Sequence, residues 1–400
     1  MIEVKKKQPI SAFISLFAVY LFFTPLDFLP IIPGVSFSIA KILILLPLLG
    51  AALELRNFLG PDKKSIPVFL YLLVVGITLV YSIDRRKSLE RFISVGLNTI
   101  LIVFVALRRY RKEEVQYLLK AYVYSAWLLL LLTVIYSDIS ATERRLTVAV
   151  NGQEQDPNYL TGFFTFSICY YLWGFIQHRK KRYLIYVIIF FIPIFLTGSR
   201  GGLLANGIAV FCVLFFERKK LNFSHVLIII ITSISLFAVA WRFVPESIKV
   251  RYTLEFTQAD GGAHRFDTWE SCLDTFKRAS ILRKLLGFGA NSIGYLNNRG
   301  GVAHNLFIEF LLEYGIIGTI LICWMLVYYI CLAYKTREGY MIAAFIGYLI
   351  MMMSLSLFSY KPMWNLLLFI ILSFNVALKS DKDKSKQSFP AIKKSDHLNK

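Results

Sequence analysis

The sequence predicts an all-α, polytopic membrane bundle with about twelve transmembrane helices, each long enough for a bilayer core of about 30 Å. Of its 400 residues, 56% are hydrophobic and 18% are charged, and the mean hydropathy is +0.59. A soluble chain of this length carries more charge and interrupts its apolar runs more often. The apolar runs are continuous rather than alternating, which indicates helices that satisfy their own backbone polar groups, not strands of a barrel.

The expected spans follow one another with short polar connections. They fall near residues 10–29, 36–53, 66–83, 92–107, 115–136, 158–177, 183–198, 202–217, 225–244, 305–333, 340–358 and 363–378. One large loop, for which we expect short amphipathic helices, separates the last three spans from the others. The expected parts are residues 1–241 (transmembrane), 242–303 (the large loop), 304–379 (transmembrane) and 380–400 (a disordered cytoplasmic tail).

Positive charge predicts the orientation, because lysine and arginine concentrate in cytoplasmic loops. The net charge is +20. With Lys5–Lys7 inside, every second loop is cytoplasmic, and each of these is rich in cations, including Arg179–Arg182 and the tail after Lys379. Both termini are then cytoplasmic and the large loop faces outward. The outward stretch Asp84–Arg91 also carries an excess of cations, which we interpret as a use for positive charge on the outer surface.

The most informative stretch is Gly287–Gly318, where a glycine- and asparagine-rich loop leads into an apolar helix. His304 stands at this junction, and Asn305, Glu309 and Glu313 follow at intervals of four, on one side of a helix. Carboxylates at membrane depth are costly unless they pair or line a cavity. A lone histidine is often a capping or buried structural residue. Here the glutamates and the outward arginines favour a site, with the glutamates as partners of the arginines.

Outward cations suggest phosphate binding. Arg200 lies in a glycine-flanked turn, Thr197–Gly202 (TGSRGG), and a guanidinium matches phosphate bidentately. Arg265 and Trp269 share one side of the amphipathic segment Arg265–Arg278. That segment either simply lies on the outer leaflet or also holds a lipid-borne anion. Less certain candidates in the large loop are Arg242 and Arg251.

Simpler explanations compete at two further positions. Lys41 interrupts an apolar span near its outer end, where snorkelling suffices, although a phosphate contact is the alternative. Asp156–Asn158 (DPN) places a capping residue and a proline at the first turn of a span. Capping explains Asp156, while Asn158 could also bind sugar hydroxyls.

The signatures of several other enzyme classes are missing from the sequence. It has no Walker loop, HExxH motif, serine nucleophile elbow or outward acidic metal cluster, and its five cysteines show no paired spacing. An outward site has no ATP, so the energy must arrive in an activated substrate. Arginines around a single histidine indicate an anionic leaving group held by cations and one base that activates a hydroxyl.

In their order along the chain, these motifs resemble the O-antigen ligase/polymerase superfamily (Wzy/WaaL-like). The matching pieces are DPN at Asp156–Asn158, TGSRGG at Thr197–Gly202, Arg265-x-x-x-Trp269, GFG at Gly287–Gly289, AHN at Ala303–Asn305 and EYGIIG at Glu313–Gly318. The resemblance implies a GT-C-like fold in the bacterial cytoplasmic (inner) membrane. It also implies metal-independent transfer of glycan from undecaprenyl diphosphate to an acceptor hydroxyl, without any cofactor.

The resemblance also implies residue roles. Arg200 and Arg265 would hold the diphosphate, and His304 would activate or orient the acceptor hydroxyl. Substrate contacts are expected from Asp156, Asn158, Lys41, Arg242, Arg251, Trp269, Asn305, Glu309 and Glu313. The implied partners are the lipid-linked donor, a glycan or lipid A–core acceptor, membrane lipids, a flippase and a chain-length regulator, and no nucleic acid.

Three functions stay open at this point. A polymerase transfers the growing chain to another lipid-linked unit, and a ligase transfers it to lipid A–core; we slightly favour the polymerase. A lipid-linked oligosaccharide flippase belongs to another class and should carry cations in the middle of several spans. The candidates here cluster at the outer face instead, which argues against a flippase. A non-catalytic scaffold would not need the polar stripe after His304.

Overall fold

The computed structural model describes most of the chain. The described residues are 9–27, 39–58, 62–140, 145–150, 153–222, 224, 227–231, 235, 238, 241–242, 244–259, 265–296, 301–356, 358 and 360–388. Lys5–Lys7 and half of the span expected at 225–244 lie outside them.

The prediction of a helical membrane protein is confirmed. Five described helical stretches are long and apolar enough to cross a membrane: Lys63–Tyr81 (η3, Lys63–Ser65, and α4, Ile66–Tyr81), α5 (Arg85–Leu107), α6 (Lys112–Tyr136), α7 (Pro157–His178) and α16 (Leu306–Lys335). Further helices occupy other expected spans: α1 (Ala12–Phe22), α2 (Ile39–Leu43), α3 (Leu45–Leu53), α8 (Lys181–Leu196), α9 (Arg200–Phe216), α17 (Gly339–Met352) and α18 (Lys361–Ser388). Short 3-10 turns follow α1, α3 and α9: η1 (Thr24–Asp27), η2 (Leu55–Asn57) and η4 (Arg218–Lys220).

Helix α7 forms the centre of the bundle. Its most apolar window is 89% buried, against 28–44% for the other four candidate spans, and it has the lowest mean hydropathy of the five, 1.2. It packs against α8, α9 and α17. A helix surrounded by protein can carry polar and small side chains that a lipid-facing helix cannot, which explains its lower hydropathy.

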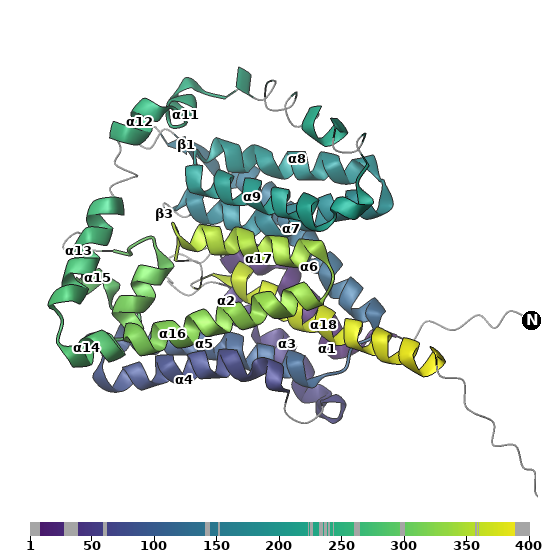
Figure 1. The fold of residues 1–400 in the computed structure, drawn as a ribbon, viewed down its shortest axis with the longest axis horizontal. Helices are drawn as coiled ribbons and strands as arrows, with labels where there is room; N and C mark the ends of the chain where they lie inside the picture. Colours follow the sequence, from purple (N-terminus) through teal and green to yellow (C-terminus); the bar gives the residue numbers. More distant parts are fainter. Residues whose placement is uncertain are drawn as a thin grey trace, which may run out of the picture.

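The two ends of the bundle differ. In Figure 1 the long helices run across the view, and helices from the stretch 242–303 gather at one end, which we call the loop end. The end of α18 projects from the opposite side, which we call the tail end. The helix continues to Ser388, into the stretch for which we predicted a disordered tail; residues 389–400 lie outside the described ones.

The large loop contains the short helices expected of it. They are α11 (Glu246–Val250), α12 (Leu254–Ala259), α13 (Arg265–Arg278), α14 (Ile281–Leu286) and α15 (Ile293–Leu296). The apolar stripe of α13 divides its contacts: Trp269 and Phe276 pack against buried Cys272 and its neighbours, whereas Phe266 is 61% exposed. The helix is therefore anchored on the protein, with one aromatic ring left at the surface.

A small antiparallel sheet at the loop end was not predicted. Strands β1 (Ser137–Ser140), β2 (Arg145–Val150) and β3 (Gln153–Gln155) pair in sequence order, with Ser137 opposite Val148 and Val148 opposite Gln155. Threonine and valines in β2 favour an extended strand. Leu146, Val148 and Val150 are buried at intervals of two, so the sheet is fixed to the bundle.

Candidate active site at the loop end of the bundle

His304 occupies a strained position immediately before α16. The side chain is half-buried, and its backbone φ of 52° lies in the left-handed region. For a residue other than glycine this conformation costs about 1–3 kcal/mol, and it persists only where the surroundings hold it. Non-glycine residues in such conformations cluster at functional sites, so the backbone itself marks His304.

Hydrogen bonds to Ala303 hold the peptide on one side of His304. The Ala303 N–H donates to Glu309 Oε1 at 3.1 Å, and the Trp269 indole N–H donates to the Ala303 carbonyl at 2.8 Å. Ser356 donates its hydroxyl to the same Glu309 oxygen at 2.5 Å. Glu309 and Trp269 thus contact the backbone beside His304, whereas the sequence reading assigned both side chains to substrate.

Asn305 holds the other side. Its Oδ1 accepts hydrogen bonds from the N–H groups of Phe307 (3.1 Å) and Ile308 (3.3 Å), which caps the start of α16. Asn305 is buried, as are Glu309 and Glu313. The predicted polar stripe therefore exists, and its first members orient the helix start rather than line an open surface.

The glycine-rich loop before His304 locks onto a break in α16. Gly315 has φ 64° inside this helix, and the Phe288 and Gly289 N–H groups donate to the carbonyls of Leu312 and Glu313 at 2.8 and 3.0 Å. Gly287, with φ 81°, lies so close that a Cβ on it would come within 2.4 Å of the Glu313 carbonyl oxygen. The GFG and EYG motifs are thus two halves of one backbone contact.

The far side of this loop is fixed by the α4–α5 connection. Ser88 donates to the Ala290 carbonyl at 2.6 Å, Ala290 N–H donates to Thr78 Oγ1 at 3.3 Å, and Ile83 N–H donates to the Phe288 carbonyl at 3.1 Å. Arg283 donates to the Tyr81 carbonyl at 3.1 Å. The loop is a rigid spacer between α4, α5 and α16, and it fixes the position from which the chain reaches His304.

Several charges act on His304. Burial lowers the pKa of its imidazole below the usual value, the Asp156 carboxylate opposes this by raising it, and the cations Arg265 and Arg145 lower it further. Its buried Nδ1 has no hydrogen-bond partner among the described residues. The imidazole is therefore neutral at pH 7, with one ring nitrogen free of other described groups.

Arginines gather around Gly198, in the turn before α9. The guanidinium carbons of Arg200 and Arg251 lie 5.8 and 5.5 Å from the centre of the Phe256 ring. A Cβ on Gly198 (φ 61°) would come within 2.8 Å of Arg251 Cδ and 3.7 Å of Arg145 Cβ. Gly198 thus makes room for Arg251. Arg145 links this cluster with His304, because its charge also acts on the imidazole.

The remaining residues of the TGSRGG turn are structural. Ser199 accepts a hydrogen bond from Gly202 N–H at 3.1 Å and caps α9. A Cβ on Gly202 would come within 2.4 Å of Thr161 Oγ1, so this glycine allows α9 to approach α7. These contacts fix the start of α9, and with it the backbone position from which the Arg200 side chain extends.

The other predicted residues divide between the site and its surroundings. Asp156 caps α7 and accepts from the Asn158 amide at 2.6 Å, so the pair lies beside His304 with Asn158 bound to the carboxylate. Arg242 is exposed, and its neighbour Trp241 packs against Phe195 instead. Lys41 is not brought to His304: its charge acts instead on the buried Lys361.

Two residues at the site were not among the predicted site residues. Arg91, from the cationic stretch Asp84–Arg91, interacts electrostatically with Glu313 and Glu309 and approaches Asn291 Oδ1 at 3.5 Å. It provides the positive partner that the sequence reading sought for the glutamates. Arg145 comes from the polar stretch before α7. For both residues, the sequence signal was a polar stretch whose positive charges the sequence reading had not assigned to any role. Among the described residues, no group of three or more histidine, cysteine or acidic side chains is placed to hold a metal ion.

Comparisons with known proteins agree with the sequence reading. The family model described as O-antigen ligase matches residues 184–323, which contain every quoted motif except DPN. No curated protein matches the chain. Among solved structures, one chain from "Structural coordination of polymerization and crosslinking by a peptidoglycan synthase complex" is similar at 14% sequence identity and TM-score 0.47, covering 81% of this chain and 99% of that one. The match over residues 184–323 supports the predicted resemblance to the O-antigen ligase/polymerase superfamily.

Proposed function

We propose that the loop end faces outward from the bacterial cytoplasmic membrane and carries a glycosyltransferase site. The site transfers glycan from an undecaprenyl-diphosphate carrier to an acceptor hydroxyl, as a polymerase of O-antigen, capsule or exopolysaccharide. The observation that carries the proposal is His304 itself: its buried Nδ1 has no hydrogen-bond partner among the described residues, and the charges of Arg265 and Arg145 act on its imidazole, in a chain that matches the O-antigen ligase family model. Both termini are then cytoplasmic.

In the proposed reaction, His304 is the base. The acceptor hydroxyl oxygen attacks the anomeric carbon of the donor glycan and loses its proton to the imidazole. The bond between that carbon and the diphosphate oxygen breaks, and the electron pair leaves with undecaprenyl diphosphate. Because the imidazole is neutral before the reaction, it can accept the proton directly.

The arginines stabilise the leaving diphosphate. Arg200, Arg251 and Arg145 provide positive charge on one side of the site, and Arg265 adds to it near the imidazole. Guanidinium groups suit this task because each can bind two phosphate oxygens at once. The Asp156 charge favours the protonated imidazole, so it assists proton uptake as the hydroxyl is consumed.

The decisive experiment replaces His304 with alanine in the host strain and follows the glycan ladder on gels. We expect long glycans to disappear while the protein stays in the membrane at its normal level. The control is His178→Ala, which removes an exposed histidine at the tail end of α7. Retention of long glycans in the His304 variant would overturn the catalytic assignment.

The linkage of the product distinguishes the two functions of the superfamily. A polymerase leaves the long glycan on a lipid diphosphate, from which mild acid releases it. A ligase moves it to lipid A–core, where the link to the carrier is lost. Accumulation of acid-labile long chains in the parent and their absence in the His304 variant would support the polymerase. If the carrier-linked units are unextended in both the parent and the variant, the result contradicts the polymerase.

A further inference from the structure

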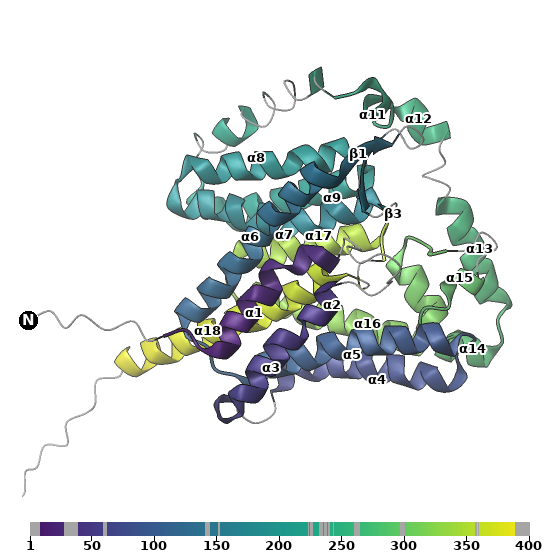
Figure 2. The same cartoon turned by 180° about the vertical axis from the view of Figure 1, so that it is seen from behind.

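A cavity lies apart from the histidine site, between α6, α7 and α8. Its volume is about 640 Å³. One wall is a single face of α6, on which Lys120, Tyr124, Trp127, Leu128 and Leu131 recur at helical spacing. Helix α6 crosses the face of the molecule shown in Figure 2. Tyrosines of α7 and α8 complete the lining: Tyr170, Tyr171, Tyr183 and Tyr186.

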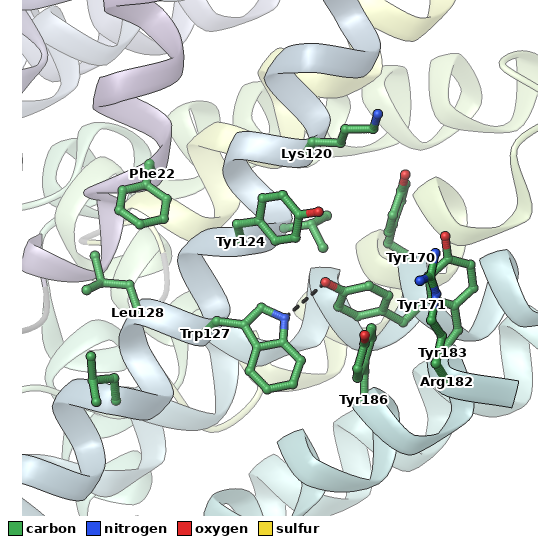
Figure 3. Close-up of a pocket in the computed structure, with 12 residues that line it drawn as sticks. Phe22, Lys120, Tyr124, Trp127, Leu128, Tyr170, Tyr171, Arg182, Tyr183 and Tyr186 are labelled. Atoms are coloured by element: carbon green, nitrogen blue, oxygen red, sulfur yellow. Dashed lines mark hydrogen bonds between the residues drawn. The ribbon is translucent and has the colours of Figure 1, made fainter. Parts of the chain in front are cut away.

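The cavity is polar on one side and apolar on the other. Figure 3 shows Lys120, Arg182 and the hydroxyls of Tyr170 and Tyr183 toward one side, with Phe22 and Leu128 opposite. Both cations are exposed, and Arg182 follows the tail-end turn between α7 and α8. The cavity therefore has a positive end that lies toward the tail end of the bundle.

Its walls are ordered by contacts among their own aromatic side chains. The Trp127 indole N–H donates to the Tyr171 hydroxyl at 3.0 Å, so the polar atom of the indole is satisfied inside the wall. Tyr124 is 54% exposed and Leu131 is 56% exposed, which shows that the cavity opens on the side that faces lipid. Tyrosine and tryptophan concentrate at the level of lipid head groups.

We propose that this cavity binds one phospholipid with an anionic head group. The acyl chains lie against Phe22, Leu128 and Leu131, and the phosphate lies between Lys120 and Arg182. On the proposed orientation this is the cytoplasmic leaflet, whose anionic lipids attract basic residues. A zwitterionic lipid offers the same phosphate, but its ammonium group would face the two cations, so the site prefers a net negative head group.

The test measures lipid binding to the purified full-length protein in detergent by native mass spectrometry. Dioleoyl phosphatidylglycerol and dioleoyl phosphatidylcholine are titrated separately. Two basic residues near an anionic head group each contribute about fivefold, so we expect phosphatidylglycerol to bind about 25-fold more tightly. The double variant Lys120→Ala/Arg182→Ala should lose this preference and keep weak binding of phosphatidylcholine, which reports an intact fold.

The matched control is Lys219→Ala/Lys335→Ala, which removes two exposed cations from tail-end turns that do not line the cavity. It should keep the preference for phosphatidylglycerol. Equal binding of the two lipids by the parent protein would overturn the proposal. So would a preference that survives in the Lys120/Arg182 variant or disappears equally in the control, because the charge selectivity would then arise elsewhere.

Discussion

Replacing Gly287 with alanine tests whether the backbone contact between the glycine-rich loop and α16 sets the site. Gly287 has φ 81°, and the new Cβ would come within 2.4 Å of the Glu313 carbonyl oxygen and 2.6 Å of Gly315 N. Backbone strain costs about 1–3 kcal/mol, and displacing close-packed atoms costs about the same again. We therefore expect a destabilisation of about 2–6 kcal/mol.

Two other glycines separate these contributions. Gly301 has φ 79°, but a Cβ there meets no described atom within 4 Å, so Gly301→Ala adds strain without collision. Gly207 lies exposed in α9, and a Cβ there also meets nothing within 4 Å. Gly207→Ala should leave stability unchanged or raise it by about 0.5–1 kcal/mol, because alanine favours helix.

The assay heats each purified variant in detergent and measures the fraction that stays monodisperse by size-exclusion chromatography. We expect the thermal midpoints to fall in the order Gly207→Ala, Gly301→Ala, Gly287→Ala. Glycan synthesis at permissive temperature should be lost only in the last variant, since only there does the loop leave α16. Equal midpoints for the Gly301 and Gly287 variants would refute the claim that the backbone contact is rigid.

Two further predictions concern the chemistry. Because the pKa of His304 is lowered below its usual 6.5, the midpoint of the acid limb of activity should lie below pH 6.5; Asp156→Asn should move this acid limb lower still, since Asp156 raises the pKa. The unfolded chain takes up the proton near pH 6.5 before the folded one does, so this group also lowers stability as pH falls below that value; a limb at or above pH 6.5 would contradict the assignment. Arg200→Lys should reduce turnover about tenfold or more, because a point charge cannot replace the bidentate fork. Full activity with lysine would leave Arg200 as a turn residue only.

The sequence was sufficient to predict the helices and to single out His304 as a candidate site residue. Long apolar runs leave a bilayer-spanning chain few alternatives, and a histidine followed by glutamates in an apolar helix is conspicuous at the level of residue type. The small sheet was missed because strands as short as β3, Gln153–Gln155, carry little pattern of their own.

Residue roles were harder to predict because they depend on backbone geometry. Trp269 and Glu309 bind the peptide beside His304, and that need arises only because His304 adopts a φ of 52°. Arg91 reaches Glu313 from more than two hundred residues away, a distance over which sequence spacing gives no information. Residue type and order were enough to nominate candidate residues, whereas the contacts among them required the fold.

The contacts of the glycine-rich loop also bear on how the protein is made. Thr78 and Ser88 are synthesised and inserted early, Ala290 much later, and Gly315 later again, yet all of them meet around one loop. No partial chain released by the ribosome before Gly315 can hold His304 in its strained conformation. On the proposed function, the growing protein therefore passes through membrane insertion with its base not yet in place, and activity should appear only when the break in α16 closes onto the loop.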